Sequence, residues 1–238
     1  MNADSNAEIL EFIARPRGAA AKRPLVTLSY AQSIDGSLTW ARGAPTAISG
    51  EESLRLTHQL RAAHEAILVG IGTVQADDPQ LSVRLVKGPN PQPLVIDSQL
   101  RFPLDAKLLQ GERKPWIFCA YGLEPQRIQE LEALGCRVIP LRYAGDNKLD
   151  PKDFLKKLAE LQVGSVMLEG GAGLITSFLV MNLVDCAVIT IAPRFIGGLG
   201  VLQSRLGRSA TDVFPYIPQP GVKLLGEDLI LWGELGQS

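Results

Sequence analysis

Two glycine-rich turns, each directly after an apolar run, are the part of the sequence best suited to bind an anion. Residues 66–73 read AILVGIGT, and residues 166–173 read VMLEGGAG. A glycine lets the main chain approach a ligand closely, and a helix that starts just behind it points its first N–H groups toward that ligand. One such turn is as often structural as functional. Two together favour a pyrophosphate site, with Gly170 to Gly173 as its candidate cradle.

Acidic side chains supply the other chemistry near these turns. Asp77 and Asp78 are adjacent and precede Pro79, and Glu169 follows the second apolar run. Paired carboxylates can exchange protons with a substrate, but adjacent residues usually point apart, and capping a turn is the ordinary role of an Asp before Pro. An unpaired buried carboxylate is costly, so Glu169 needs a partner or a ligand. Spacing alone leaves these roles open.

Several other kinds of site are disfavoured. A Rossmann fingerprint needs a third glycine where this chain has Gln75. The histidines, His58 and His64, are six residues apart on one predicted helix without cysteines beside them, so we interpret them as surface or partly packed residues and expect no metal site. The sequence has no G-x-S-x-G motif, which disfavours a serine hydrolase.

The elements that position these residues alternate between strands and helices after Pro24. Strands are predicted over residues 25–31, 66–70, 93–98, 116–121, 136–140, 165–171 and 185–193. Helices are predicted over residues 49–64, 124–135, 150–162 and 172–182. Ser49 and Glu52 have the spacing of a capping box, and Asp150 is the expected N-cap of the third helix.

This alternation predicts an α/β fold with a mostly parallel central sheet and flanking helices. In such a sheet, ligands bind beyond the carboxyl ends of the strands, where both glycine turns lie. The last apolar run, residues 227–235, predicts an antiparallel hairpin or an edge strand and is a candidate interface.

The composition limits the kinds of binding partner that we expect for this protein. The chain has 238 residues and a formal charge of -1 with interspersed signs, so nucleic acid and anionic membranes are poor partners and a small ligand is favoured. Its three cysteines are widely spaced in apolar runs, which is typical of buried thiols in a cytoplasmic protein. We expect a loose amino-terminal arm over residues 1–23 and a single domain over residues 24–238.

Five ordered motifs resemble the pyrimidine reductases of riboflavin biosynthesis. They are VTLSYAQSIDG (26–36), AISG (47–50), HQLRAAHEAILVGIGTVQADDPQLSVR (58–84), PLVIDSQLRFP (93–103) and MLEGGAGLITSFL (167–179). The resemblance implies a dihydrofolate-reductase-like fold, a homodimer, and NADPH-dependent reduction of the ribosyl group of a phosphoribosylamino-pyrimidine to a ribityl group. The zinc deaminase signature that precedes the reductase in many bacterial members is not found, so we expect a stand-alone reductase.

The resemblance also implies which residues contact the cofactor. Thr73 and Asp77 offer a hydroxyl and a carboxylate to a dinucleotide, and Gly70 leaves room for it. Further family positions are Ala31, Ala47 and Ser98, together with the segment that wraps the diphosphate: Gly170, Gly171, Ala172, Gly173, Leu174, Ile175, Thr176 and Ser177. Arg101, just beyond a predicted strand end, is our choice for the cation that recognises the 2′-phosphate of NADPH.

The substrate positions of the family fall on Arg61, Leu81, Arg84 and Glu169. Two guanidiniums suit a ribose 5-phosphate. The alternative is that Arg61 and Arg84 only form surface ion pairs with residues such as Glu65 or Asp78.

The sequence leaves the proton donor and the final substrate open. Asp35, Asp77 and Glu169 are candidates for the general acid. Many bacterial members have lysine where this chain has Ser29, so the 2-amino group of the substrate is either still present or already removed. The alternatives are reduction of another heterocycle, such as a dihydropterin, or a dinucleotide-binding regulatory module without turnover.

Overall fold

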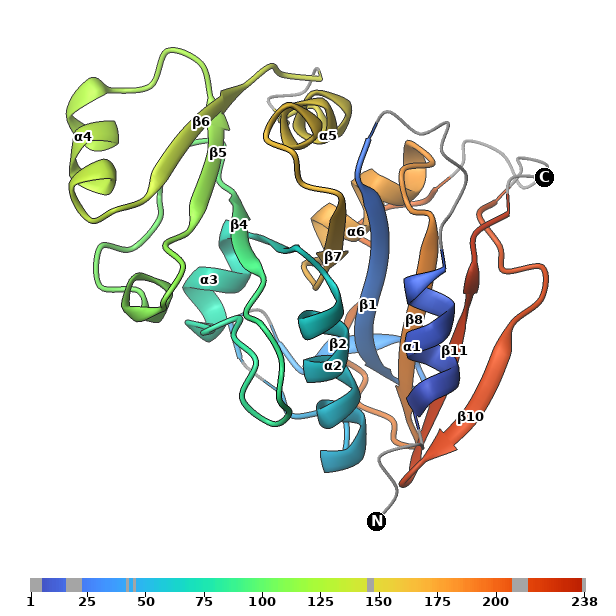
Figure 1. Ribbon diagram of the computed structural model, residues 1–238. Coiled ribbons are helices and arrows are strands. Elements are labelled where there is room, and N and C mark those ends of the chain that lie inside the picture. The colour runs from blue at the N-terminus through green and yellow to red at the C-terminus, as the bar shows by residue number, and fades with distance from the viewer. Residues whose placement is uncertain are drawn as a thin grey trace.

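A mixed β-sheet forms the centre of the molecule (Figure 1). The computed structural model describes residues 6–15, 23–41, 43–44, 46–144, 148–206 and 214–236. Within these residues, nine strands follow the order β10-β11-β8-β1-β7-β3-β4-β5-β6. They are β1 (Leu25–Ser33), β3 (Ala66–Gly70), β4 (Gln92–Ile96), β5 (Trp116–Ala120), β6 (Arg137–Leu141), β7 (Ser165–Leu168), β8 (Cys186–Ala192), β10 (Gly221–Leu225) and β11 (Asp228–Glu234). A small separate sheet pairs β2 (Ser37–Thr39) with β9 (Leu199–Gly200).

The strands from β8 to β6 in this order are all parallel, and the carboxyl-terminal hairpin is antiparallel. The predicted α/β architecture with a carboxyl-terminal hairpin is therefore confirmed. The last apolar run, however, is not the edge strand. It forms β11, which lies between β8 and β10 and is hydrogen-bonded on both sides. The edge strand on this side of the sheet is β10, where Val222 and Leu224 are exposed.

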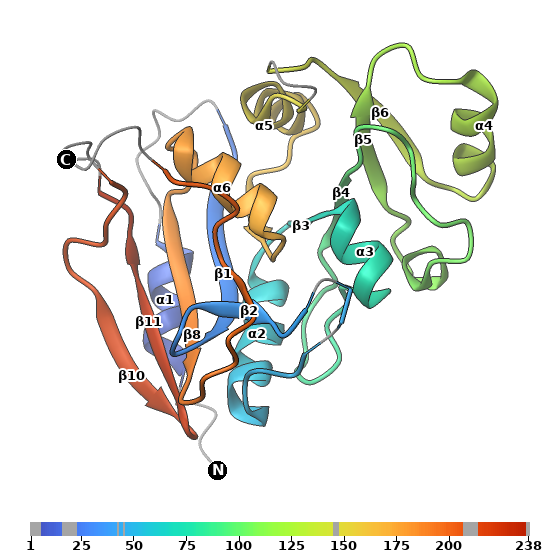
Figure 2. The same ribbon diagram turned by 180° about the vertical axis from the view of Figure 1, so that it is seen from behind.

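Helices cover both faces of the sheet, as the two opposite views show (Figure 1; Figure 2). They are α1 (Ala7–Ala14), α2 (Glu51–Ala63), α3 (Ile71–Asp77), α4 (Pro125–Ala133), α5 (Pro151–Glu160) and α6 (Ala172–Val180), with a 3-10 helix over Lys107–Gln110. Buried residues of α5 and α6 share one core cluster, whereas those of α1 and α2 share another on the opposite side. Residues of β7 and β8 alternate between these clusters, since successive side chains point to opposite faces.

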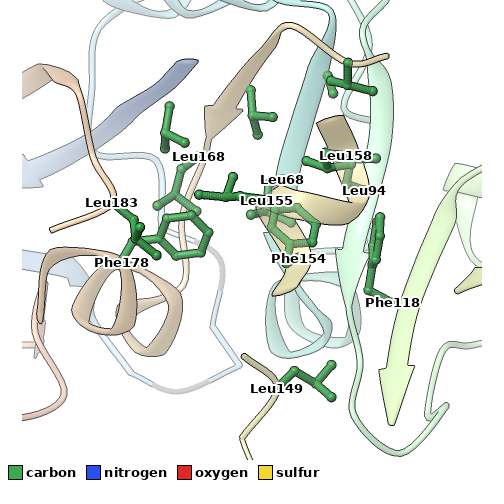
Figure 3. Packing of buried hydrophobic residues seen from close by; sticks show 14 of the residues in the cluster. Leu68, Leu94, Phe118, Leu149, Phe154, Leu155, Leu158, Leu168, Phe178 and Leu183 are labelled. Atoms are coloured by element: carbon green, nitrogen blue, oxygen red, sulfur yellow. The ribbon is translucent and has the colours of Figure 1, made fainter. Parts of the chain in front are cut away.

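The largest core cluster is organised around Phe154 of α5 (Figure 3). Its ring packs edge-on against Phe118 with centroids 4.7 Å apart, and against Phe178 at 6.3 Å. All three rings are buried, and burial of each such side chain contributes about 1.5 to 3 kcal/mol. Leu68 and Leu168, which sit two residues before Gly70 and Gly170, belong to the same cluster. The core therefore fixes the strands that lead into both glycine turns.

The amino-terminal region differs from the loose arm that we expected. Residues 1–5 and 16–22 lie outside the described residues. Between them, α1 buries Ile9 and Ile13, which are four residues apart and so lie on one helical face. They pack in a cluster with Leu56 and Leu60 of α2.

Of two predicted helix starts, one was wrong and one was confirmed. The helix α2 has Gly50 as its N-cap without a side-chain cap bond, so the Ser49 capping box does not form. The Gly50 N–H instead donates to the Asp228 carboxylate at 2.8 Å, a tertiary contact that sequence spacing does not encode. The third predicted helix does begin as expected, with Asp150 accepting from the Lys152 N–H at 2.8 Å.

Candidate active site

The carboxyl ends of four adjacent strands form one edge of the sheet. The strands β1, β7, β3 and β4 are neighbours and parallel. In their register Leu28 pairs with Leu168, and Leu168 with Leu68, so β7 and β3 end close together. The strand β1 continues five residues further, to Ser33. As a result Ala31, Glu169, the 70–73 turn and Ser98 are all presented at this edge.

The two glycine turns are in contact there. Gly170 and Gly171 have φ angles of 97° and 84°, which a residue with a side chain adopts only with strain. A Cβ atom on Gly171 would lie 3.5 Å from Oγ1 of Thr73, and one on Gly70 would lie 3.5 Å from Cδ1 of Leu174. The start of α6 therefore lies directly against the β3–α3 turn. Its first N–H groups have no acceptor inside the helix, so together with the Thr73 hydroxyl they suit a pyrophosphate.

The α6 segment offers a ligand its main chain more than its side chains. Ile175 and Thr176 are buried, and the Thr176 hydroxyl donates to the Ala172 carbonyl at 2.7 Å. The Ser177 hydroxyl donates to the Gly173 carbonyl at 2.9 Å. Of the residues expected to wrap a diphosphate, the first few have the geometry for it, whereas the Ile175 side chain belongs to the core.

Asp35 has a different environment from the one a proton donor needs. Its carboxylate accepts hydrogen bonds from the Ser33 and Ser37 hydroxyls and from the N–H groups of Ile196 and Gly197, the last at 2.7 Å. The Ser33 hydroxyl and these amides hold the pKa of Asp35 well below its ordinary value of 3.8. An acid that stays ionised near neutral pH cannot donate a proton, so the geometry disfavours Asp35 as the general acid.

Asp35 instead anchors a loop over the glycine turns. This loop, Ile196–Gln203, is called the upper loop below. The Gly198 N–H donates to the Ser37 hydroxyl at 3.0 Å, and the Gln203 N–H donates to the Thr176 hydroxyl at 3.0 Å. The loop thus runs from the β1–β2 turn to α6. Its far end lies close to the predicted diphosphate segment, since a Cβ atom on Gly173 would meet the Gln203 side chain at 3.0 Å.

Arg61 and Glu169, two of the predicted substrate residues, form an ion pair with each other. The guanidinium donates through Nε to Oε2 at 2.8 Å and through Nη2 to Oε1. Their side chains are 9% and 22% exposed. Burial by itself would lower the pKa of Arg61, but the Glu169 carboxylate raises it above its ordinary value. Glu169 has therefore found the partner that it was expected to need, and both of its oxygens accept hydrogen bonds from Arg61.

The segment Leu81–Arg84, called the lower loop below, lies beside this pair. Arg61 Nη1 donates to the Ser82 carbonyl at 3.1 Å, and the Arg84 N–H donates to Nδ1 of His58 at 2.9 Å. The Arg84 side chain is exposed, and its Nη1 donates to the Ser82 hydroxyl at 2.8 Å. Leu81 has a φ of 51° and is buried, so its side chain is not available to a ligand.

The surface ion pairs that we considered as alternatives are not the ones that form. Asp78 caps the end of α3, accepts from the Lys107 N–H at 2.8 Å and lies 3.3 Å from Lys107 Nζ. Glu65 accepts from the Gly164 N–H at 2.8 Å. Arg61 binds Glu169 in place of either acid.

The remaining predicted positions differ in burial, and within the part of the chain that the structure describes no side-chain hydrogen bond joins them to the groups above. Ser98 is half-buried, Ala47 is exposed, Asp77 is exposed at the last residue of α3, and Ser29 is buried on β1. Arg101 has 49% of its side chain exposed and places Nε 3.5 Å from the buried Asp97 carboxylate.

Both histidines contradict the interpretation of surface or partly packed residues. His58 is 1% exposed and His64 is 4% exposed. The ring of His64 contacts the Leu60 carbonyl at 2.7 Å and the Thr27 hydroxyl at 2.8 Å. Among the residues that the structure describes, no group of three His, Cys, Asp or Glu side chains is arranged to hold a metal ion, and no helix is long and apolar enough to cross a membrane.

Sequence reasoning missed His58, the upper loop and Asn90, whose side chain accepts from the Val83 N–H at 2.8 Å. The signal for His58 was present, since it precedes Arg61 by three residues and so lies on the same helical face. The upper loop is bound mainly through main-chain amides, which have no sequence signature.

Comparison with known proteins places this arrangement in a family. The RibD proteins of Aquifex aeolicus and Actinobacillus pleuropneumoniae are 37% and 33% identical over 212 and 213 residues, which are 89% and 88% of this chain but only 58% and 56% of those proteins. The chain therefore spans a little over half of their length. The 2,5-diamino-6-ribosylamino-4(3H)-pyrimidinone 5′-phosphate reductase of Methanothermobacter thermautotrophicus is 39% identical over 214 residues, 88% of this chain and 97% of that protein.

Solved structures agree with the sequence matches. RibD from Acinetobacter baumannii superposes with a TM-score of 0.77 at 27% identity, covering 92% of this chain and 59% of that one. The riboflavin biosynthesis reductase Rib7 of Saccharomyces cerevisiae gives a TM-score of 0.75 at 26% identity, covering 98% and 100%. The dihydrofolate-reductase-like fold is thereby confirmed. Residues 24–224 match the RibD C-terminal domain, and the chain belongs to this family of riboflavin-biosynthesis reductases.

Proposed function

We propose that the protein is an NADPH-dependent reductase of 2,5-diamino-6-ribosylamino-4(3H)-pyrimidinone 5′-phosphate, which it converts to the ribitylamino form. The observation that carries this proposal is the meeting of two kinds of group at one sheet edge. The glycine turns and Thr73 lie at β3 and β7, and the Arg61–Glu169 pair with the exposed Arg84 lies beside them. One part suits a dinucleotide and the other a phosphorylated substrate.

The residues present fit a nicotinamide dinucleotide. The start of α6 and Thr73 would hold its pyrophosphate, and Ala31, Ala47, Asp77 and Ser98 are further contacts that family resemblance suggests. The fit rests on the adjacent positive-φ glycines and on the contact of Gly171 with Thr73. When bound, NADPH supplies the hydride that the reduction requires. The chain's own task is to hold both reactants in register and to exclude water between them.

Arg101 is our proposal for the residue that distinguishes NADPH from NADH. Its guanidinium is half exposed beyond the end of β4, close to Ser98 in the chain, and the neighbouring Asp97 carboxylate limits its freedom. In an Arg101→Ala variant we expect the preference for NADPH over NADH to fall by about tenfold, because a cation facing the 2′-phosphate forms a charge-assisted bond. The ratio of kcat/KM for the two cofactors checks this. An unchanged ratio would place the 2′-phosphate elsewhere.

On the substrate side, we assign the 5-phosphate to the exposed guanidinium of Arg84, with Arg61 close by. Arg61 is largely neutralised by Glu169, so its main role is to shape the lower loop and the floor of the site. Of the three acids considered as proton donors, Asp77 is the one whose carboxylate is not engaged in the contacts described above. Asp77 is exposed at the end of α3, and local desolvation shifts its pKa upward from the ordinary value, in the direction that suits a proton donor. Solvent and the amine of the substrate are the other donors available.

Several finer assignments belong to the same proposal. The relatives whose length the chain nearly spans are named for the diamino substrate, and Ser29 replaces the lysine of many bacterial members, so we favour a substrate that retains its 2-amino group. We also propose a cytoplasmic homodimer. The three cysteines are buried thiols, which fit a reducing compartment, and the exposed edge strand β10 offers a surface for a second copy.

The test is steady-state oxidation of NADPH with three potential substrates. We expect turnover with the diamino pyrimidinone phosphate, slower turnover with its deaminated uracil counterpart, and none with a dihydropterin. A faster reaction with the uracil compound would indicate that the substrate is deaminated before it is reduced, contrary to our proposal. Turnover of the dihydropterin alone would identify a different reductase. Tight NADPH binding without turnover of any compound would support a regulatory module.

A further inference from the structure

The lower loop is held on both sides by hydrogen bonds to its main chain. From α2, the Arg61 guanidinium binds the Ser82 carbonyl and His58 Nδ1 accepts the Arg84 N–H at 2.9 Å. From the other side, the Asn90 side chain accepts the Val83 N–H at 2.8 Å. Three successive residues of the loop are therefore fixed at defined atoms, although none belongs to a helix or a strand.

The contact with His58 is the one that reaches Arg84 directly. His58 and Arg61 are three residues apart in α2, so the imidazole ring and the guanidinium project from the same helical face. Because Nδ1 accepts a hydrogen bond, the proton of the neutral ring must lie on Nε2. A doubly protonated ring would turn an N–H toward the Arg84 N–H and break the contact.

The surroundings of His58 keep it in the neutral form that this contact needs. Burial, together with the charges of Arg61 on α2 and Arg84 on the loop, lowers the pKa of His58 to about 4, although the Glu169 carboxylate at the end of β7 acts in the opposite direction. An apolar residue at this position would leave the Arg84 N–H without an acceptor, whereas an exposed histidine would lose the contact by protonation in mildly acidic solution.

We infer that His58 is a positioning residue for phosphate recognition: it fixes the main chain of Arg84 so that the exposed guanidinium is presented to the substrate phosphate. This role rests on the proposed function, since it concerns the same site. It adds a residue that touches neither reactant and acts through Arg84. Its loss would impair binding of a phosphorylated substrate more than binding of NADPH.

Two polar variants separate this role from general packing. In His58→Asn, the side-chain oxygen occupies the place of Nδ1 and can still accept the Arg84 N–H. In His58→Gln, the amide reaches the place of Nε2 and leaves the Nδ1 position without an acceptor. Both side chains are polar and similar in size, so a difference between the two variants reports on the acceptor itself.

The first readout is hydrogen exchange of the Arg84 amide, which needs no substrate. We expect slow exchange in the parent and in His58→Asn, and exchange at least about tenfold faster in His58→Gln, because loss of an intramolecular acceptor exposes the amide to solvent. Equal exchange in the two variants would overturn the inference. This readout stands even if the protein proves to reduce another compound, so failure of the proposed function is recognised separately.

The second readout is the KM for the phosphorylated pyrimidine, measured with both variants. We expect His58→Gln to raise it by about three- to tenfold, with the KM for NADPH changed by less than about twofold and His58→Asn close to the parent. An equal rise in both KM values would indicate a general structural role and overturn the inference. So would a loss of the same size with the dephosphorylated substrate.

Discussion

The lower and the upper loop flank the same sheet edge, yet they are held by different chemistry. The lower loop depends on neutral acceptors, His58 and Asn90, and on one guanidinium that is itself paired with Glu169. The upper loop depends on the ionised carboxylate of Asp35, which gathers two amides and two hydroxyls. The first arrangement leaves the Arg84 side chain available for an anion. The second fixes the loop beside the glycine turns through a carboxylate whose charge is bound by four hydrogen-bond donors.

The largest expected effect comes from removing the ion pair beneath the lower loop. In Arg61→Ala the Glu169 carboxylate loses its partner, and we expect the free energy of unfolding to fall by about 2 to 3 kcal/mol, less than for a fully buried pair because Glu169 keeps 22% of its side chain exposed. Urea denaturation measures this. Arg84→Ala is the matched control, since its exposed side chain should change stability by less than about 0.5 kcal/mol. Equal stability of the two variants would contradict the structural role of Arg61.

A smaller effect is expected from the anchor of the upper loop. Asp35→Asn keeps the shape of the side chain but removes the charge, and its NH₂ group would face the donors that now bind the carboxylate. We expect faster amide exchange over Ile196–Gln203 and an affinity for NADPH about three- to tenfold weaker, with little change in the KM for the pyrimidine. Ser37→Ala removes one of the hydrogen bonds to the carboxylate and the acceptor of the Gly198 N–H, but it leaves the charge of Asp35 in place, so we expect smaller changes in the same direction. An unchanged affinity for NADPH would separate the upper loop from the cofactor site.

The smallest expected effect is a difference between the two loops in how their contribution to stability depends on pH. The pKa of His58 is about 4 in the folded protein and about 6.5 in the unfolded chain, so the unfolded state binds more protons between these values. The contribution of His58 to stability is therefore complete above pH 6.5 and falls as the pH decreases toward 4. The pKa of Asp35 is depressed below 3.8, so its contribution persists through that window and is lost only at lower pH.

Unfolding free energies of the parent, His58→Asn and Asp35→Asn between pH 4 and 7 check this difference. The gap between the parent and His58→Asn should change with pH across the window. The gap between the parent and Asp35→Asn should stay nearly constant. Parallel profiles for both variants would contradict the assignment of charge states.

The sequence predicted the parts of the fold that periodicity and strand order determine. Seven parallel strands with apolar runs were visible, as was the helix that Asp150 caps, because each depends on local residues. The α2 cap was missed because the N-cap is Gly50 and not Ser49, and the Gly50 N–H is bound by Asp228, which is remote in sequence. The helix α1 was missed because its short apolar pattern acquires meaning only when α2 lies beside it.

The candidate site was predictable in its residue types and less so in its contacts. Glycine before a helix, and arginine near a strand end, carry chemical information that can be recognised along the chain. The pairing of Arg61 with Glu169 joins residues 108 positions apart, and the role of Asp35 depends on amides 161 and 162 positions away. Sequence therefore indicated Asp35 and Glu169 as possible acids, whereas the structure commits both to hydrogen bonds as acceptors.

The central claim is that the exposed Arg84, held by α2, recognises the phosphate of the substrate. The most direct measurement is kcat/KM for the phosphorylated pyrimidine and for its dephosphorylated analogue, with the parent and with Arg84→Ala. We expect the parent to prefer the phosphorylated compound, and the variant to lose about ten- to a hundredfold on that compound alone, with NADPH binding unchanged. Equal losses on both compounds would contradict the account, since they would assign Arg84 to structure and the phosphate to another part of the protein.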